Sequence, residues 1–220
     1  MASEREPILL ATRSKGKLRE LSDILRDLEL RTIDLEAARV PVSADEETIE
    51  NYPTFEENAL AKARYFFSLT GIAAIGDDSG LEVDALGGAP GVLSKRYSGR
   101  NDLDGATLDA ANNAKLMREL ARLDDERRAK DEPPAPRSAR YVSVAAYAGP
   151  QGEILRRGTI EGRMISEPRG NGGFGYDPYF EPPELGGTFA EASWALKSQL
   201  SHRGRSFRAL VIALRERGWA

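Results

Sequence analysis

Two adjacent carboxylates, Asp77 and Asp78, follow a short apolar run in the segment Ile72 to Gly91 (IAAIGDDSGLEVDALGGAPG). A glycine stands on each side of the pair, and Ser79 follows it. Carboxylate oxygens are the ligands that Mg²⁺ prefers, and glycines let a backbone come close to a ligand. We predict a strand over Ile72 to Ile75 that ends in a turn carrying the two aspartates. An ordinary turn capped by aspartate is the alternative interpretation.

Acidic residues upstream are candidates to assist this pair. The segment Val40 to Pro53 is irregular, with Asp45, Glu46 and Glu47 at its centre. Such charge runs usually form a solvated loop. If the segment contributes to the acidic corner, Glu46 or Glu47 is the residue that we expect to help hold a metal ion.

A basic segment, Thr12 to Lys17 (TRSKGK), follows the apolar run Ile8 to Ala11 and precedes a helical pattern that begins at Leu18. A strand, a polar loop and a helix in this order direct backbone N–H groups and a helix N-terminus at an anion. The loop lacks the GxxxxGK[ST] pattern, so it is not a Walker A loop. A solvated basic turn is the alternative, and Lys17 is the cation most suited to a phosphate.

Further cations stand near the C-terminus, at Lys197, His202 and Arg203. Ser201 is a natural helix N-cap, which places His202, the only histidine, and Arg203 in the first helical turn. Cations at a helix N-terminus oppose the helix dipole. An anionic ligand at that end would relieve the conflict, although a lone histidine is more often structural or solvated.

An aromatic segment, Phe174-Gly175-Tyr176-Asp177, lies in a glycine-rich stretch. An aromatic ring among glycines is a candidate surface for stacking a base, and an aspartate can accept a hydrogen bond from ring N–H groups. Ordinary core packing of the two rings is equally compatible with these residues. Together, carboxylates for Mg²⁺, cations for phosphates and an aromatic ring for a base predict a nucleotide site.

Composition limits the class of protein. The chain has 220 residues, which is enough for one core or for one domain with two lobes. With 40% apolar and 30% charged residues, its composition is ordinary for a soluble globular protein. The net charge of −4 argues against bulk binding of nucleic-acid backbones. The chain has no cysteine and no apolar run long enough to span a membrane, so we expect a cytoplasmic protein.

Periodicity predicts alternating strands and helices. We expect strands at Ile8 to Ala11 and Arg31 to Leu35, and a hairpin over Tyr141 to Met164. Helices are expected from Leu18, from Thr54 to Gly71, over Thr107 to Leu123, and over Ser201 to Arg217. The charged, Pro-rich segment 124–140 is predicted to be a peripheral flexible loop.

The chain resembles the inosine triphosphate pyrophosphatases, which remove non-standard purine nucleoside triphosphates. The resemblance rests on five segments in family order: ILLATRSKGKLREL, TFEENALAKAR, DDSGLEVDALGGAPGVLSKRYSG, GFGYDPYF and KSQLSHRGRSF. It covers essentially the whole chain. It implies an α/β, two-lobed fold with a long mixed β-sheet flanked by helices and an active-site cleft between the lobes. It also implies a homodimer, dependence on Mg²⁺, and hydrolysis of dITP, ITP and XTP to the monophosphate and pyrophosphate.

The resemblance also implies residue roles. Asp78 is the expected catalytic residue and metal ligand, with Glu47 as the second metal ligand. Substrate contacts are expected at Thr12, Arg13, Ser14, Lys15, Gly16, Lys17, Ser79, Phe174, Gly175, Tyr176, Asp177, Lys197, His202 and Arg203. Ser14 departs from the family, which usually has asparagine there, and serine has a shorter reach.

Two other functions are open at this stage. One is a pyrophosphatase for other modified nucleotides, such as methylated pyrimidine triphosphates. The other is a non-catalytic nucleotide- or RNA-binding protein, which the acidic net charge disfavours. We expect no membrane association and no stable nucleic-acid partner.

Overall fold

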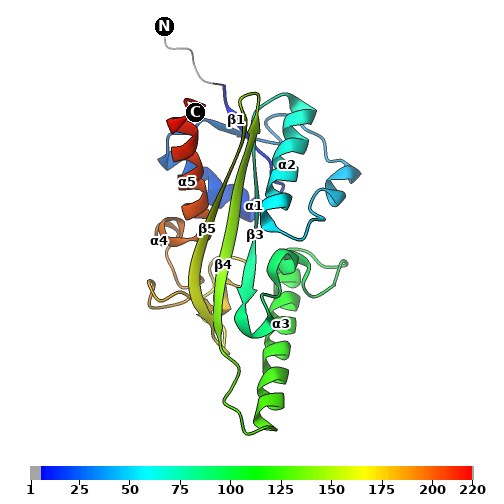
Figure 1. The fold of residues 1–220 in the computed structure, drawn as a ribbon, viewed down its shortest axis with the longest axis vertical. Coiled ribbons are helices and arrows are strands. Elements are labelled where there is room, and N and C mark those ends of the chain that lie inside the picture. Colours follow the sequence, from blue (N-terminus) through cyan, green and yellow to red (C-terminus); the bar gives the residue numbers. More distant parts are fainter. Residues whose placement is uncertain (1–5, 220) are drawn as a thin grey trace. The chain divides into compact units, whose positions relative to one another are not determined.

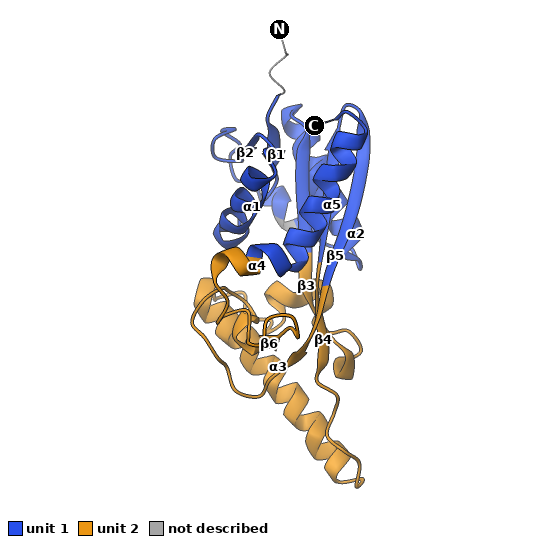
Figure 2. Ribbon diagram, turned by 90° about the vertical axis from the view of Figure 1, so that its left-hand side faces the viewer, with its two compact units in different colours: residues 1–78, 143–159, 198–220 blue, residues 79–142, 160–197 orange. Residues whose placement is uncertain are grey.

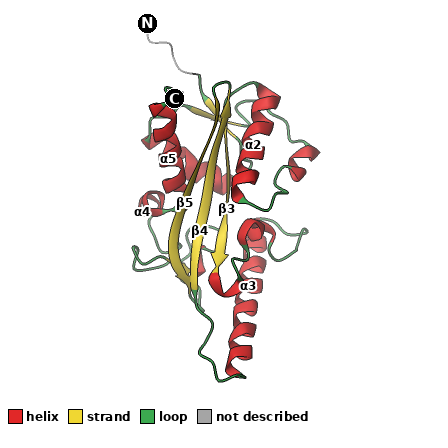
Figure 3. Ribbon diagram, viewed as in Figure 1, coloured by secondary structure: helices red, strands yellow, loops and turns green. Residues whose placement is uncertain are grey.

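A computed structural model describes residues 6–219, apart from the side chain of Glu47 (Figures 1 and 3). Its strands are β1 (Ile8–Leu10), β2 (Thr32–Asp34), β3 (Ala74–Val83), β4 (Ser138–Gly149), β5 (Gly152–Met164) and β6 (Phe180–Glu181). Its α-helices are α1 (Lys15–Asp27), α2 (Phe55–Thr70), α3 (Gly105–Arg128), α4 (Trp194–Leu200) and α5 (His202–Glu216).

Within the described residues, six strands form one sheet in the order β2-β1-β3-β4-β5-β6. Strand β1 pairs in parallel with both β2 and β3, whereas β5 and β6 are antiparallel. The sheet is therefore mixed, and helices flank it (Figure 3). The predicted α/β class with a mixed sheet is confirmed.

The chain divides into two compact units (Figure 2). Unit 1 comprises residues 1–78, 143–159 and 198–220, and unit 2 comprises residues 79–142 and 160–197. Strands β3, β4 and β5 contribute residues to both units. The sequence prediction of a single domain with two lobes, and of a cleft, stays a prediction.

The core of unit 1 has a layer on each face of the sheet. Ile8 and Leu10 of β1 belong to an apolar cluster with α1 and α5, whereas Leu9 belongs to a second cluster with Phe66 of α2. Successive strand residues point to opposite faces, so β1 is buried on both sides, as is typical of a parallel strand. Ile75 of β3 faces α1 and α5, and Ala74 faces α2.

Strand β3 differs from its prediction. We expected a strand that ends at Ile75 and a turn over 76–80, but β3 continues to Val83. Gly76 is in the strand because helix α2 lies against it: a Cβ there would stand 2.6 Å from the carbonyl oxygen of Ala59 and 2.9 Å from the nitrogen of Ala63. The glycine provides space for a helix, and the two aspartates lie mid-strand, on opposite faces.

Helix ends in unit 1 follow the sequence signals. Thr54 caps α2 by accepting a hydrogen bond from the backbone of Glu57, and Gly71 ends the helix with a φ of 70°. Ser201 caps α5 and accepts from Gly204 N. Helix α4 and strand β6, both short, were not predicted.

Unit 2 packs around three rings and helix α3. Tyr141 lies 4.8 Å from Phe180 and 5.9 Å from Phe189 between ring centroids. Helix α3 extends to Arg128, and β4 begins at Ser138, so the irregular part of the predicted 124–140 loop is shorter than expected. Charged residues suit an exposed helix as well as a loop. No helix in residues 6–219 is long and apolar enough to cross a membrane.

Candidate active site

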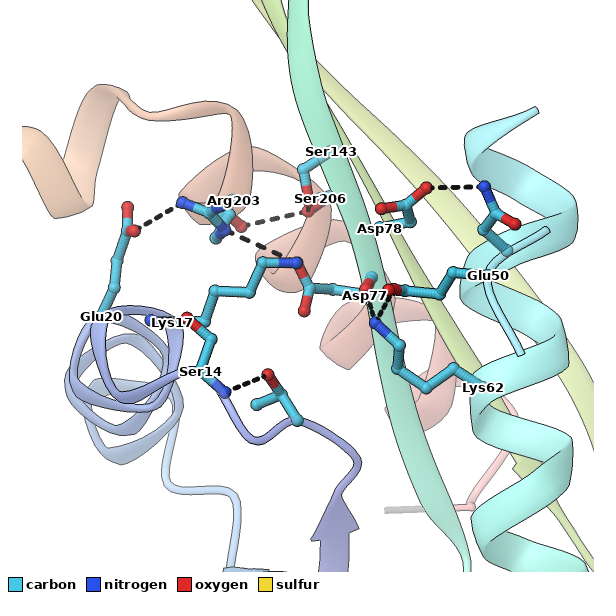
Figure 4. Close-up of polar contacts among 12 residues, drawn as sticks. Ser14, Lys17, Glu20, Glu50, Lys62, Asp77, Asp78, Ser143, Arg203 and Ser206 are labelled. Atoms are coloured by element: carbon cyan, nitrogen blue, oxygen red, sulfur yellow. Dashed lines mark hydrogen bonds and ion pairs between the residues drawn. The ribbon is translucent and has the colours of Figure 1, made fainter. Parts of the chain in front are cut away.

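Asp77 is the centre of a buried ion-pair network in unit 1 (Figure 4). Its Oδ2 atom lies 2.9 Å from Lys17 Nζ and 3.5 Å from Arg203 Nε. Lys62 donates to the Asp77 carbonyl oxygen at 2.9 Å. Burial favours the neutral carboxyl, but the charges of Lys17, Arg203 and Lys62 prevail and lower the pKa of Asp77 to about 2. Asp77 is therefore a permanent anion that holds basic side chains in place.

Asp78 points to the opposite face of β3, toward α2 (Figure 4). Its Oδ2 atom accepts a hydrogen bond of 3.0 Å from Asn58 Nδ2, and the residue is 8% exposed. Burial raises the pKa of Asp78 to about 6, and the negative charge of Glu50 contributes to the rise. A carboxyl with a pKa this close to neutrality is suited to accept a proton.

Glu50 is a site residue that sequence reasoning missed. It forms an ion pair with Lys62 of α2 and interacts electrostatically with Lys17 and Asp77. Glu46, by contrast, pairs with Arg13 at 2.8 Å and closes a capping box with Ser43. The position of Glu50 in the chain is a signal that could have identified it. Glu50 is the nearest acidic residue before the helix that carries Asn58 and Lys62.

The predicted metal ligand Glu47 has a side chain that lies outside the described part of the structure. No cluster of three or more His, Cys, Asp or Glu side chains suited to a metal occurs among the residues that the structure describes. The negative charge of Glu50 acts on Asp78, which makes Glu50 a described carboxylate that could share a metal ion with it.

The basic segment leads into α1, as predicted, but the helix begins at Lys15 and not at Leu18, so Lys15, Gly16 and Lys17 are helical. Ser14 caps α1, and its Oγ accepts from Lys17 N at 3.4 Å, so serine serves as a cap at this position. Thr12 Oγ1 accepts from Ser14 N at 3.2 Å. Lys15 is exposed, and Gly16 is half-buried at the start of the helix. Burial lowers the pKa of Lys17, although Asp77 partly opposes this.

Arg13 is engaged with the protein itself. Its guanidinium binds the carboxylate of Glu46 and donates to the carbonyl oxygens of Val40 at 3.0 Å and Pro41 at 2.9 Å. These contacts tie the basic loop to the acidic segment, so the expected substrate contact at Arg13 would have to compete with them.

Arg203 and His202 lie buried in the first turn of α5. Arg203 donates to Glu20 of α1 at 2.8 Å, and it also approaches Asp77. The protein therefore supplies two anions that offset the cation at this helix N-terminus, a role that the sequence had suggested for a ligand. Glu20 is another residue that sequence reasoning missed, because an acidic residue inside a helix gives no local sign of a partner 183 positions away.

The aromatic loop belongs to unit 2. Asp177 Oδ2 accepts from Phe174 N at 2.8 Å and from Lys197 Nζ at 2.5 Å. The Lys197 ammonium lies 4.8 Å from the Phe174 ring centroid, a cation–π distance. Tyr176 is buried, and its hydroxyl donates to Ser94 O at 2.9 Å. The loop therefore presents Phe174, while Asp177 and Tyr176 hold it.

The structure groups the predicted residues into two sets. Unit 1 brings together a buried set: Lys17, Asp77, Asp78 and Arg203. Unit 2 brings together Phe174, Asp177 and Lys197, with half-buried Ser79 also in that unit. Lys17 and Asp78 of the first set suit phosphate and metal chemistry, and the second set suits a planar ring.

A family model described as the Ham1 family matches residues 8–213, which include every residue of both sets. The chain belongs to the Ham1 family. The family prediction made from five sequence segments is thereby confirmed.

Two curated relatives of this Ham1 chain are named dITP/XTP pyrophosphatase. A dITP/XTP pyrophosphatase of Mycolicibacterium paratuberculosis is 47% identical over 209 residues, which are 94% of this chain and 95% of the relative. A dITP/XTP pyrophosphatase of Thermus thermophilus is 42% identical over 212 residues, 95% of this chain and 92% of the relative.

Solved structures agree with the Ham1 assignment. A HAM1 protein from Coxiella burnetii has a TM-score of 0.77 and 37% identity, and the match covers 96% of this chain and 100% of that one. A nucleoside-triphosphatase (dITP/XTP pyrophosphatase) from Mycobacterium abscessus has a TM-score of 0.66 and 40% identity, with 93% and 98% covered.

Proposed function

We propose that this chain hydrolyses the non-standard purine nucleoside triphosphates dITP, ITP and XTP to the nucleoside monophosphate and pyrophosphate. Identity of 42–47% to curated dITP/XTP pyrophosphatases, over 94–95% of this chain, supports the substrate class. The observation that carries the proposal is the contrast between two neighbouring aspartates. The negative charge of Asp77 is balanced by the ammonium of Lys17, whereas the pKa of Asp78 is raised to about 6. One carboxylate organises cations for phosphates, and the other is able to take a proton.

We propose Mg²⁺ as the cofactor, held by Asp78 and Glu50 together with substrate phosphates and water. The donor set fits: both ligands are carboxylates, and Mg²⁺ is commonly held by one or two carboxylates plus phosphates. Burial and the negative charge of Glu50 raise the pKa of Asp78, and a cation would stabilise the ionised carboxylate, which is the form that accepts a proton. When bound, the ion would supply positive charge that offsets the triphosphate.

The chemical step assigned to the chain's own residues is proton acceptance by Asp78. Asp78 takes a proton from water as the water oxygen attacks the α-phosphorus. The bond from the α-phosphorus to its bridging oxygen breaks, and the electron pair leaves with pyrophosphate. Lys17 and the N-terminal backbone of α1 bind the phosphates and stabilise the charge on the leaving group. Asp77 positions Lys17 through their 2.9 Å ion pair.

Purine recognition is assigned to the aromatic loop and to the first turn of α5. Phe174 stacks on the purine, and Asp177 sets the position of Phe174 through its backbone N–H. Lys197 lies over Phe174, so we propose a role for it at the purine end of the substrate. His202 and Arg203 donate to the 6-oxo oxygen of the base. An adenine amino group would leave such donors unpaired, which is costly in a buried site.

The homodimer and the cytoplasmic location implied by the family resemblance stay proposals. Product analysis tests the reaction type. Incubation with dITP and Mg²⁺ should release dIMP and pyrophosphate in equal amounts. Release of dIDP and orthophosphate would instead indicate attack at the γ-phosphorus and would refute the proposed reaction.

A further inference from the structure

Helix α3 holds both polar groups of the Gly175 peptide backbone. Asp109 Oδ2 accepts from Gly175 N at 2.8 Å, and Asn113 Nδ2 donates to Gly175 O at 2.9 Å. Asp109 and Asn113 are four positions apart, so they share one face of the helix. All three residues belong to unit 2.

Asn113 is also anchored to its own helix. Its Nδ2 atom donates to Asp109 O at 2.9 Å as well as to Gly175 O. The residue is buried, so its amide cannot readily exchange these hydrogen bonds for bonds to water, and its orientation is fixed. The pair Asp109 and Asn113 therefore acts as a rigid clamp on the peptide groups on each side of Gly175.

The loop needs this clamp because packing does not fix it there. Gly175 and helix α3 line a cavity of about 550 Å³, together with the segment 170–174. A Cβ at Gly175 would meet nothing within 4 Å, and the residue has a φ of 64°, in the left-handed region. A glycine beside open space moves easily, and two hydrogen bonds are the contacts with α3 that oppose the movement.

The clamp acts on the residue next to Phe174. The Phe174–Gly175 peptide contains the N–H that Asp109 binds, so its plane sets the direction of the Phe174 side chain. On the other side, Asp177 binds Phe174 N at 2.8 Å. The backbone of Phe174 is thus fixed on both sides: Asp177 holds its N–H, and Asp109 and Asn113 hold the following residue, Gly175.

We propose that Asp109 and Asn113 are positioning residues for the purine, holding Phe174 in its stacking orientation through Gly175. This inference rests on the proposed function, and it adds two residues that act through the backbone of Gly175. It assigns them to binding of the base and separates them from Lys17 and Asp78, which act on phosphates.

The test compares Asp109→Ala, Asn113→Ala and Asp109→Asn with the unmodified protein. Each alanine variant loses one clamp hydrogen bond, so KM for dITP should rise about tenfold while kcat changes less than about twofold. Asp109→Asn keeps an oxygen acceptor for Gly175 N and should restore most of the affinity. Asp125→Ala, on the exposed part of α3, is the matched control and should behave as the unmodified protein.

Inorganic tripolyphosphate separates positioning of the base from general damage, because it has phosphates and no purine. Its inhibition constant should be the same in every variant. The inference is overturned if KM for dITP is unchanged in both alanine variants, or if the tripolyphosphate constant rises in parallel with KM. Calorimetric binding of IMP to the unmodified protein gives a readout without turnover. If IMP binds and dITP is not hydrolysed, the proposed reaction fails, and weaker IMP binding by the alanine variants still supports the clamp. If IMP does not bind, the clamp proposal fails.

Discussion

The Nζ atom of Lys17 lies 2.9 Å from Asp77 Oδ2, while the next residue, Asp78, bonds to Asn58 on the other face of the same strand. Strand alternation therefore gives two adjacent aspartates opposite environments. One carboxylate is surrounded by cations, and the other is buried close to a second carboxylate.

The two aspartates should have opposite effects on stability without metal. Asp78→Asn removes a buried carboxylate whose pKa of about 6 exceeds the ordinary 3.8, so it should stabilise the metal-free protein at pH 8 by about 3 kcal/mol. The folded state binds the proton more tightly, so the gain should shrink below pH 6 and disappear below about pH 4. Urea unfolding in EDTA at several pH values measures this.

Asp77→Asn is the matched comparison. The pKa of Asp77 is lowered to about 2, so the ionised form contributes about 2 kcal/mol above pH 4, and this is lost as the pH falls from 4 to 2. Asp77→Asn should therefore destabilise the protein at pH 8. Both variants should lose activity. Equal effects of the two substitutions on stability would contradict the account.

Glu50 and Glu47 are separated by their dependence on Mg²⁺. Glu50→Gln should raise the Mg²⁺ concentration that gives half-maximal activity by about tenfold or more, because one proposed ligand loses its charge. Glu47→Gln should leave it within about twofold. Titration of activity with Mg²⁺ at saturating dITP makes the comparison. If Glu47→Gln instead raises the required Mg²⁺ concentration more than Glu50→Gln does, Glu47 and not Glu50 is the metal ligand.

The chain-local part of the site could be predicted from sequence, and the long-range part could not. Lys17, Asp78 and Phe174 stand in short motifs whose composition indicates their chemistry. Glu20 meets Arg203 across 183 positions, and that pairing depends on how α1 and α5 pack on one face of the sheet. No spacing rule along the chain encodes it.

Glu20 should matter for stability through Arg203. Glu20→Gln keeps the shape but removes a charge from a buried ion pair, so the free energy of unfolding should fall by about 3 kcal/mol. Asp23→Asn, at a pair with the exposed Arg26 on the same helix, should change it by less than about 1 kcal/mol. Chemical unfolding of both variants is the measurement. A similar loss of unfolding free energy in the two variants would mean that the buried ion pair stabilises the protein no more than the pair at the surface.

Gly76 illustrates how a sequence signal can be misinterpreted. The glycines around the aspartates predicted a turn, but Gly76 is a strand residue in contact with α2. Sequence alone does not distinguish a glycine needed for backbone conformation from one needed for space. At Gly76, a Cβ would lie only 2.6 Å from the carbonyl oxygen of Ala59, so this glycine is needed for space.

Gly76→Ala should therefore destabilise the protein by about 3 kcal/mol, because α2 or β3 must shift to admit a methyl group. Gly71→Ala provides the comparison: a Cβ there meets nothing within 4 Å, and the cost is the strain of a φ of 70°, about 1 kcal/mol. Thermal unfolding of both variants decides. If Gly76→Ala costs no more than Gly71→Ala, close packing is not the reason for the glycine.

The proposed substrate specificity is tested by pyrophosphate release from dITP, XTP, dATP and dGTP, measured with the purified protein and Mg²⁺. We predict that kcat/KM for dITP and XTP exceeds that for dATP and dGTP by at least about 100-fold. Against dATP the reason is that donors to a 6-oxo group are left unpaired by a 6-amino group. Guanine keeps the 6-oxo group, so discrimination against dGTP requires that the site exclude its 2-amino group. Comparable values on all four substrates, or turnover confined to modified pyrimidine triphosphates, would contradict this prediction.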